Sequence, residues 1–444
     1  MRSDQQQAIN RLAGTSATAF LCAVLCVYPL YIDKFSNLGV TKFTGCFTLF
    51  LLFLLWLVAC TAIGARAPRP RNANAGRDVT LWGVLAFAGT SLISTFTSLS
   101  PTASTWGLGG YYGGLMLVLF TAAGYWAVRS YLDLENLDFV FWVLGITTSI
   151  VAVLYVLNIF NIDLIGAYAD TAVVERAQFF STLGQKDFNG CFFSVALPIV
   201  FYQFLNAKDT RTAVWTGIPA AFGALALAVV DSEALALGIG AAVMVLVCHK
   251  NFTTRHLRRA VLISAAFFGW AAWMHYMRAS VYTQGGTALL AKLGAWQVAL
   301  PCMAASLLLW LVLFVLAHKG IAAQAPLYLP GRVITIAVLA VGALAFVLAN
   351  AMPNLPLPES LHNLLVFNDD WGTYRGVAWR AAFGTWADGS LLRKIVGIGP
   401  GMMHTAVAAW AGGAMTARMA TFYAAHNEYL EQLLTTGILG LAAW

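Results

Sequence analysis

Long apolar runs separated by short polar segments dominate the chain. A membrane-spanning helix needs about 20 mostly apolar residues in succession, and most of the runs approach or exceed that length. The pattern therefore predicts an all-α, polytopic membrane protein of about 12 transmembrane helices, organised as a single membrane domain over residues 1–444. The last run is still apolar at Trp444, which predicts a truncated C-terminus. The predicted spans are 14–32, 43–65, 79–97, 114–131, 138–159, 189–207, 212–230, 232–248, 260–277, 294–317, 333–352 and 428–444.

Composition supports the same class of protein. Hydrophobic residues make up 60% of the chain and charged residues only 10%, against about 25% charged in an ordinary soluble domain. The net charge of +7 is spread over short basic clusters between the apolar runs. It therefore indicates membrane topology, and we expect no nucleic acid among the partners.

Orientation follows from these basic clusters, because Lys and Arg near the end of a span resist translocation. With the N-terminus in the cytoplasm, fifteen of them fall in cytoplasmic segments and six in the short outer segments. We therefore predict a multi-pass protein of the cytoplasmic (inner) membrane with one long extracytoplasmic loop, residues 353–427. The cytoplasmic set is Arg2, Arg11, Arg66, Arg69, Arg71, Arg77, Arg129, Lys208, Arg211, Lys250, Arg255, Arg258, Arg259, Lys319 and Arg332; the outer set is Lys34, Lys42, Arg176, Lys186, Arg278 and Lys292.

Three short outer segments carry polar groups, and each has two interpretations. The glycine-rich stretch 105–114 is typical of a flexible interfacial turn. Arg176 and Lys186, just before a predicted helix, can bind phosphate oxygens or anchor the chain to anionic lipid headgroups. Asp231 and Glu233 form a short acidic turn, which is either simply exposed to water or placed for acid-base chemistry.

The long loop, 353–427, is the main candidate for function because helix connections are usually only a few residues long. Arg375, Trp379 and Trp386 have the spacing of one helical face, which predicts an amphipathic helix on the membrane surface. A glycine-rich turn, 396–401, follows and lacks the features of a phosphate loop. His426 and Glu428 then lie at the mouth of the last predicted span. The pKa of a free histidine, near 6.5, suits proton transfer.

The residues from His426 to Glu431, followed by Gly437 to Leu441, resemble the signature of the O-antigen ligase and O-antigen polymerase family. Arg375 with Trp379, and then the glycine turn, match that family's motifs in order. Residues 182–190 are similar to its Gly-Asn-x-Asn segment. The resemblance covers about residues 100–444 and is most specific at the C-terminal end.

The resemblance implies a membrane glycosyltransferase that is metal-independent and inverting, and that uses no cofactor. It would transfer or polymerise a glycan from an undecaprenyl diphosphate-linked donor onto a glycan, lipid or protein acceptor outside the membrane. His426 would be the catalytic base and Arg375 would hold the diphosphate, while Arg176, Lys186, Arg380 and Glu428 would be substrate-binding residues. Membrane lipids are further expected partners.

Two departures from the family pattern keep other functions open. Ser232 and Glu233 stand where the family commonly has Ser-Arg, and residues 184–187 differ from the Gly-Asn-x-Asn motif. If the family's arginine binds phosphate, then in this chain Arg176, Lys186, Arg278 or Arg380 would bind it instead. A transporter or flippase of lipid-linked glycans is the main alternative, and a non-catalytic family member is the third. A transporter predicts inverted repeats and ionisable residues at mid-membrane depth, and neither is visible in the sequence.

Overall fold

The computed structural model describes residues 2–64, 78–108, 110, 112–230, 232–281, 283, 293–321, 324–352, 355–411 and 422–444. Helices dominate these residues. A two-stranded antiparallel hairpin, β1 (Phe179–Phe180) and β2 (Gly184–Gln185), pairs Phe180 with Gly184.

Nine helices within the described residues are long and apolar enough to cross a membrane, which confirms an all-α, multi-pass membrane protein. The other three predicted spans correspond to shorter helices, so the number twelve and the orientation stay predictions. These shorter elements are α5 (Leu115–Tyr131), α9 (Glu233–Cys248) and the pair α18 (Glu428–Thr435) and α19 (Gly437–Ala443). The nine candidate spans are Asp4–Leu30, Phe35–Ala62, Val79–Phe96, Leu134–Ile159, Lys186–Asn206, Thr210–Val229, Thr254–Ser280, Trp296–His318 and Tyr328–Ala351.

The predicted span 428–444 is interrupted at Gly437, where φ is +71°. A Cβ atom at this position would lie 2.3 Å from the carbonyl oxygen of Ile395. Only glycine permits both the left-handed conformation and this close approach. The eight residues of α18 extend about 12 Å, so α18 is too short to cross a membrane by itself and is not among the nine candidate spans.

The chain divides into two compact units. The first comprises Met1–Ala17, Phe47–Leu132 and Leu339–Trp444, and the second comprises Thr18–Cys46 and Asp133–Val338. Three long helices, α1 (Arg2–Cys22), α2 (Leu38–Gly64) and α12 (Tyr328–Ala351), pass from one unit into the other. One π-helical turn (Ala23–Val27) and one 3-10 turn (Tyr28–Leu30) continue α1.

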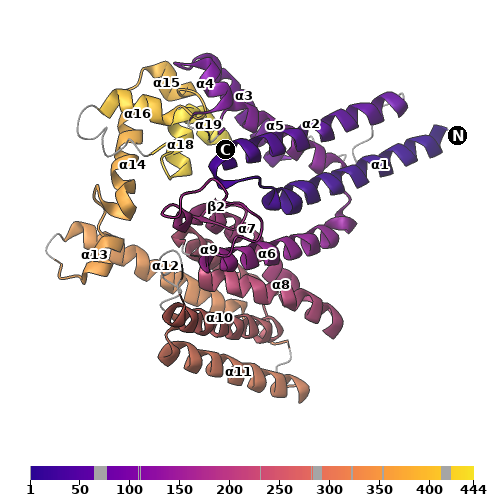
Figure 1. Ribbon diagram of the computed structural model, residues 1–444, viewed down its shortest axis with the longest axis vertical. Helices are drawn as coiled ribbons and strands as arrows, with labels where there is room; N and C mark the ends of the chain where they lie inside the picture. The colour runs from indigo at the N-terminus through magenta and orange to yellow at the C-terminus, as the bar shows by residue number, and fades with distance from the viewer. Residues whose placement is uncertain are drawn as a thin grey trace. The chain divides into compact units, whose positions relative to one another are not determined.

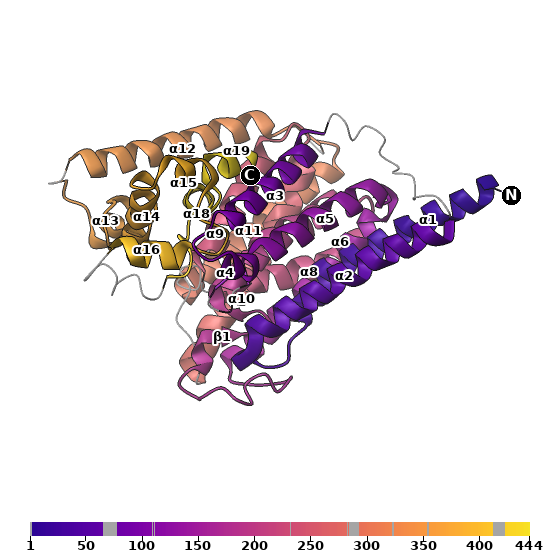
Figure 2. The same cartoon turned by 90° about the horizontal axis from the view of Figure 1, so that it is seen from above.

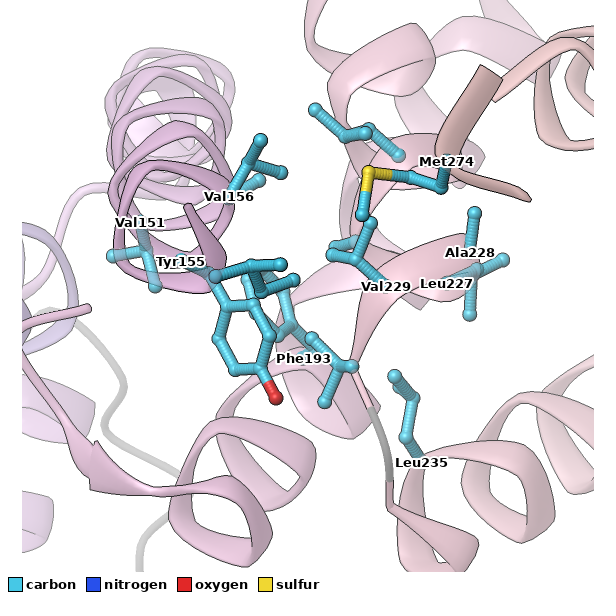
Figure 3. Packing of buried hydrophobic residues seen from close by; sticks show 14 of the residues in the cluster. Val151, Tyr155, Val156, Phe193, Leu227, Ala228, Val229, Leu235 and Met274 are labelled. Atoms are coloured by element: carbon cyan, nitrogen blue, oxygen red, sulfur yellow. The ribbon is translucent and has the colours of Figure 1, made fainter. Parts of the chain in front are cut away.

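The second unit is a helical bundle with a main apolar core and smaller apolar clusters. Figure 3 shows part of that core, which includes Tyr155, Phe193 and Met274. The connection from α6 to α7 carries the β-hairpin and extends past the helix ends in Figure 2. The bundle contains α6 (Leu137–Ile159), α7 (Lys186–Asn206), α8 (Thr210–Val229), α9, α10 (Thr254–Ser280) and α11 (Trp296–His318).

The first unit gathers the C-terminal short helices around α3 and α4, as Figure 1 shows. Its core lies between α14, α16 and α18 and includes Ala378, Met403 and Leu434, each at most 1% exposed. The elements of this unit, besides α5, α18 and α19, are α3 (Val79–Phe96), α4 (Pro101–Trp106), α13 (Glu359–Leu365), α14 (Trp371–Ala387), α15 (Leu391–Val396) and α16 (Met403–Ala411).

Large apolar side chains cover the outside of several helices. Leu308 on α11 and Val341 on α12 are 62% and 67% exposed. Soluble monomers rarely expose continuous apolar surfaces of this extent. Lipid is the solvent that such helix faces require.

Candidate functional site

His426 occupies an unusual backbone conformation directly before α18. Its φ is +50°, in the left-handed region that non-glycine residues seldom adopt. The side chain is exposed, and the ring of Phe422 lies edge-on at 5.3 Å between centroids. Asn427 caps α18 by accepting the backbone N–H of Leu430 at 3.2 Å. The histidine is therefore presented at the start of a capped helix.

Glu431 holds Ala425, the residue directly before His426. Its Oε2 atom accepts the backbone N–H of the fully buried Ala425 at 2.7 Å. Burial raises the pKa of the Glu431 carboxyl to about 7, against the lowering effect of the Ala425 hydrogen bond. The sequence places Glu431 near His426 but does not show this contact, because a bond six residues back depends on the local chain reversal.

His404 contacts the beginning of segment 422–427, which leads to His426 and α18. Its Nδ1 atom lies 2.8 Å from the carbonyl oxygen of Phe422, so Nδ1 carries the proton and donates. The imidazole also stacks on Tyr423, with ring centroids 4.6 Å apart. The described segment 422–427 is thus tied to α16 at one end and to α18 at the other.

Arg375 lies on α14, and this helix packs against α18. No described residue forms a hydrogen bond or ion pair with its guanidinium, and its aliphatic stem covers Gly372. The turn that carries it is irregular, because Gly372 and Tyr374 have φ values of +60° and +68°. The predicted helix around Arg375, Trp379 and Trp386 is confirmed as α14; its position on a membrane surface stays a prediction.

Two other predicted substrate-binding residues of this unit already have partners. Arg380 forms an ion pair with Asp369 through Nη2. Glu428 is exposed and accepts a hydrogen bond from Gln432 Nε2 at 2.6 Å. Neither residue is as free for a ligand as Arg375 is.

The glycine turn after α15, residues 396–401, packs closely against neighbouring helices. The backbone N–H of Gly399 donates to the Thr435 carbonyl and to Ser94 Oγ, both at 2.9 Å. With φ at +105°, a Cβ on Gly399 would lie 2.4 Å from Ser104 Oγ. The glycines let the turn press against α3, α4 and the end of α18, so this part of the family-like motif has a structural explanation.

Arg176 and Lys186 belong to the second unit, whereas Arg375 and His426 belong to the first. The Arg176 guanidinium lies over the Tyr168 ring at 5.3 Å, and its Nε donates to the Thr171 carbonyl at 3.5 Å. Lys186 is exposed at the first position of α7. Their two interpretations, phosphate binding and lipid anchoring, both stay open.

Asn189 closes the β-hairpin onto α7. It is fully buried, and its Nδ2 donates to the carbonyls of Phe180, Gly184 and Gln185 at 3.0–3.1 Å. Its Oδ1 accepts the Ser181 hydroxyl at 2.6 Å. The only asparagine of the Gly-Asn-x-Asn-like segment therefore stabilises the local fold.

Ser232 and Glu233 lie at the beginning of α9, next to the beginning of α7. Ser232 donates to Asp187 Oδ1 at 3.2 Å, while Glu233 is exposed at the start of α9. A Cβ on Gly190 would lie 2.2 Å from Ser232 Oγ, so the two helices approach closely there. Asp231, the other residue of the predicted acidic turn, lies outside the described residues.

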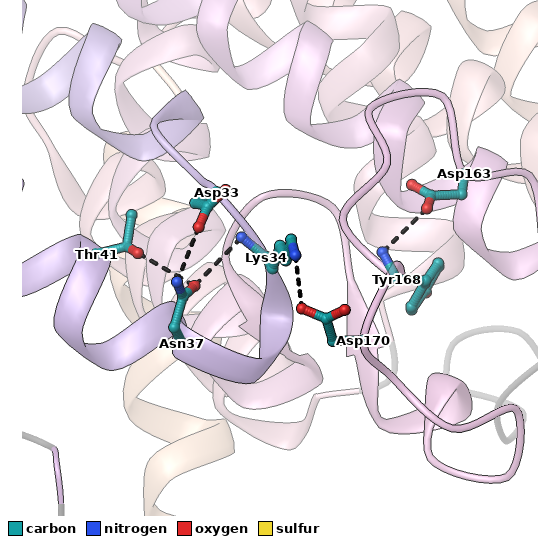
Figure 4. A network of polar contacts seen from close by, with 7 residues as sticks. All are labelled: Asp33, Lys34, Asn37, Thr41, Asp163, Tyr168 and Asp170. Carbon is teal, nitrogen blue, oxygen red and sulfur yellow. Dashed lines mark hydrogen bonds and ion pairs between the residues drawn. The ribbon is translucent and has the colours of Figure 1, made fainter.

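A polar network in the second unit was not foreseen from the sequence (Figure 4). Lys34 donates to Asp170 at 2.6 Å, and this bond raises the pKa of Lys34. Asp163 accepts the backbone N–H groups of Ala167 and Tyr168 at 2.9 and 3.0 Å. The network orders the connection that contains Arg176.

Within the described residues, no group of three or more His, Cys, Asp or Glu side chains is arranged to hold a metal ion. The chain was compared with protein-family models, with curated proteins and with solved structures, and none of the three comparisons found a match.

Proposed function

We propose that this chain is a membrane glycosyltransferase that moves a glycan from a polyprenyl diphosphate carrier to an acceptor hydroxyl, as the sequence motifs imply. The observation that carries the proposal is the presentation of His426. Its ring is exposed at a strained backbone position, while Glu431 and the cap at Asn427 fix its two neighbours. Strained conformations persist where the surrounding structure holds them, and they concentrate at functional sites.

In the proposed reaction, a ring nitrogen of His426 removes the proton of the acceptor hydroxyl. The acceptor oxygen then forms a bond to the anomeric carbon, and the bond from that carbon to the diphosphate oxygen breaks. The acceptor oxygen enters from the face opposite the diphosphate, which leaves with the electron pair, so the anomeric configuration inverts. General-base assistance of this kind contributes about 10²–10⁴ in rate.

Arg375 is the residue best suited to bind the leaving diphosphate. A guanidinium without a carboxylate partner keeps its charge available for two parallel bonds to phosphate oxygens. Arg375 meets this condition among the described residues, whereas Arg380 is paired with Asp369. This charge would stabilise the negative charge that develops on the leaving group.

The test is glycan transfer from a purified polyprenyl diphosphate-linked donor by wild-type protein and by His426→Ala and Arg375→Lys variants. Matched controls are His362→Ala on α13 and Arg393→Gln on α15, two exposed residues of the same unit. We expect a loss of at least about 100-fold for His426→Ala, a weaker loss for Arg375→Lys and unchanged controls. Full activity of both His426 and Arg375 variants would overturn the proposal.

A second measurement separates the enzyme from a transporter. Protein solubilised in detergent has no membrane to move a lipid across, so a transporter forms no product there. Formation of a new glycosidic bond in detergent supports transfer, and its absence with an active donor preparation contradicts the proposed function.

A further inference from the structure

A cleft of about 480 Å³ opens at the beginning of α14. Its volume is within the range of small-molecule sites. Four of its five lining residues are polar or charged, and one is aromatic. The lining residues are Phe367, Asn368, Asp369, Asp370 and Arg380.

The backbone that forms this cleft is fixed by specific contacts. Segment 367–370 runs across α14 at Gly376, where a Cβ would lie 1.8 Å from the Asn368 carbonyl oxygen. The N–H of Val377 donates to the Asp369 carbonyl at 3.1 Å, and Asn350 accepts the N–H of Phe367 at 2.8 Å. The side chains of the cleft are therefore held by a defined loop rather than by a flexible one.

The charges of the cleft disfavour phosphate. Arg380 is neutralised by Asp369, and Asp370 adds a second carboxylate. A diphosphate placed there would meet a net negative lining, which costs free energy. The cleft is consequently poorly suited to the carrier end of the donor, and a phosphate-binding role for Arg380 stays a prediction.

Hydroxyl groups suit the same lining well. The ion pair occupies Oδ2 of Asp369, while Oδ1 faces no donor among the described residues. The side-chain oxygen of Asn368 accepts the N–H of Asp370 at 3.0 Å, and its amide N–H groups have no described acceptor. Carboxylate acceptors beside amide and guanidinium donors are the groups that recognise vicinal hydroxyls.

An aromatic cluster flanks the polar groups. The ring of Phe367, 38% exposed, lies 5.7 Å from Trp371 and 5.9 Å from Trp379 between centroids. The indole N–H of Trp379 is buried and has no acceptor in the described part of the chain. Buried donors without a partner are rare and call for an explanation. Flat apolar rings next to hydroxyl-binding groups fit a sugar ring, which has one apolar face and a polar edge.

We propose that this cleft binds a neutral saccharide, the sugar portion of the acceptor. The assignment to the acceptor rests on the proposed function, while saccharide binding itself does not. The cleft and His426 belong to the same compact unit, and α14, which follows the cleft loop, packs on α18.

The test measures binding without turnover, using full-length His426→Ala protein in detergent. Saturation-transfer NMR is recorded with maltotetraose, chitotetraose and lacto-N-tetraose as probes, and with inorganic diphosphate as competitor. Two cleft variants, Asp369→Asn and Phe367→Leu, are added to this background. The matched control is Asp388→Asn, which alters an acid at the other end of α14 that accepts the Trp410 indole N–H at 2.8 Å.

We expect at least one saccharide to bind, with affinity at least about tenfold weaker in Asp369→Asn, unchanged in Asp388→Asn and unaffected by diphosphate. Binding that is equal in all variants, displacement by diphosphate, or no binding of any probe would overturn the inference. Unfolding temperatures within a few degrees of the parent show that the variants fold. If wild-type protein transfers no glycan but Asp369-dependent binding is present, the proposed function fails and the saccharide site stands.

Discussion

The carboxylate of Glu431 accepts the backbone N–H of Ala425 at 2.7 Å, and His426 follows Ala425 directly in a left-handed conformation. This bond spans the chain reversal that precedes α18. Removing this bond leaves the backbone of Ala425, directly before the proposed base His426, less firmly held. Glu431 itself would act by positioning His426 and not by contacting substrate.

The first prediction concerns the acceptor atom that this bond requires. Glutamine at position 431 keeps an oxygen for the Ala425 N–H, and leucine does not. We expect Glu431→Gln to retain most of the transfer activity and Glu431→Leu to lower kcat at least about tenfold with little change in KM. Steady-state kinetics of both variants test this. Equal loss in both would show that the hydrogen bond does not position His426.

The second prediction follows from the raised pKa of Glu431. Burial raises this pKa from 4.5 to about 7 in the folded protein. Between these pH values the folded state binds more protons than the unfolded state, so this group's stabilisation is fully present below about pH 4.5 and is lost as pH rises through 7. The shift corresponds to about 3 kcal/mol at most, and partial exposure makes the effect smaller.

Thermal unfolding of wild type and Glu431→Gln, followed from pH 5 to pH 8 in detergent, measures this effect. We expect the wild type to lose more stability over that range than the variant does. Parallel curves for the two proteins would contradict the raised pKa.

The third prediction concerns Gly399. Alanine would place a Cβ within 2.8 Å of the side chains of Ser98 and Ser104 at a φ of +105°. We expect Gly399→Ala to destabilise the protein by roughly 1–3 kcal/mol and to reduce transfer, because the turn supports the end of α18. Gly89→Ala in α3 is the control, since a Cβ there meets nothing within 4 Å. An equally stable Gly399→Ala protein would exclude the packing role of the turn.

Apolar runs predicted the long helices because length and hydropathy alone determine which segments can cross a bilayer. The same criterion predicted one span over 428–444, where Gly437 separates α18 from α19, so this last span stays a prediction. The spacing of Arg375, Trp379 and Trp386 predicted α14 because helical periodicity is local.

Contacts that depend on a chain reversal could not be predicted from the sequence, because helical periodicity and hydropathy are local. The cleft ion pair joins Asp369 to Arg380 only because the loop folds back over Gly376. The sequence shows the positive charge of Arg380, which suits a phosphate ligand, but not the carboxylate that pairs with it. Asn189 was part of a motif, and its buried hydrogen bonds assign it to the fold.

The fourth prediction therefore tests Asn189 as a structural residue. Asn189→Ala removes a side chain that satisfies three carbonyl groups and one hydroxyl in a fully buried place. Leaving buried polar groups unsatisfied costs about 1–3 kcal/mol each, so we expect a large loss of thermal stability. Gln185→Ala, an exposed neighbour on the hairpin, is the control. A variant at position 189 that is stable but inactive would point instead to a role in substrate binding.

The fifth prediction ranks the two arginines that the sequence proposes for the diphosphate. Arg176 already lies on the Tyr168 ring and donates to a carbonyl, whereas Arg375 has no described partner. A guanidinium that gives up existing contacts gains less from a ligand. We expect Arg375→Ala to raise the donor KM or lower kcat far more than Arg176→Ala does, in kinetics with the lipid-linked donor. The reverse order would place the diphosphate at the second unit, and the polar network around Lys34 and Asp170 would then order a donor site instead of a surface connection.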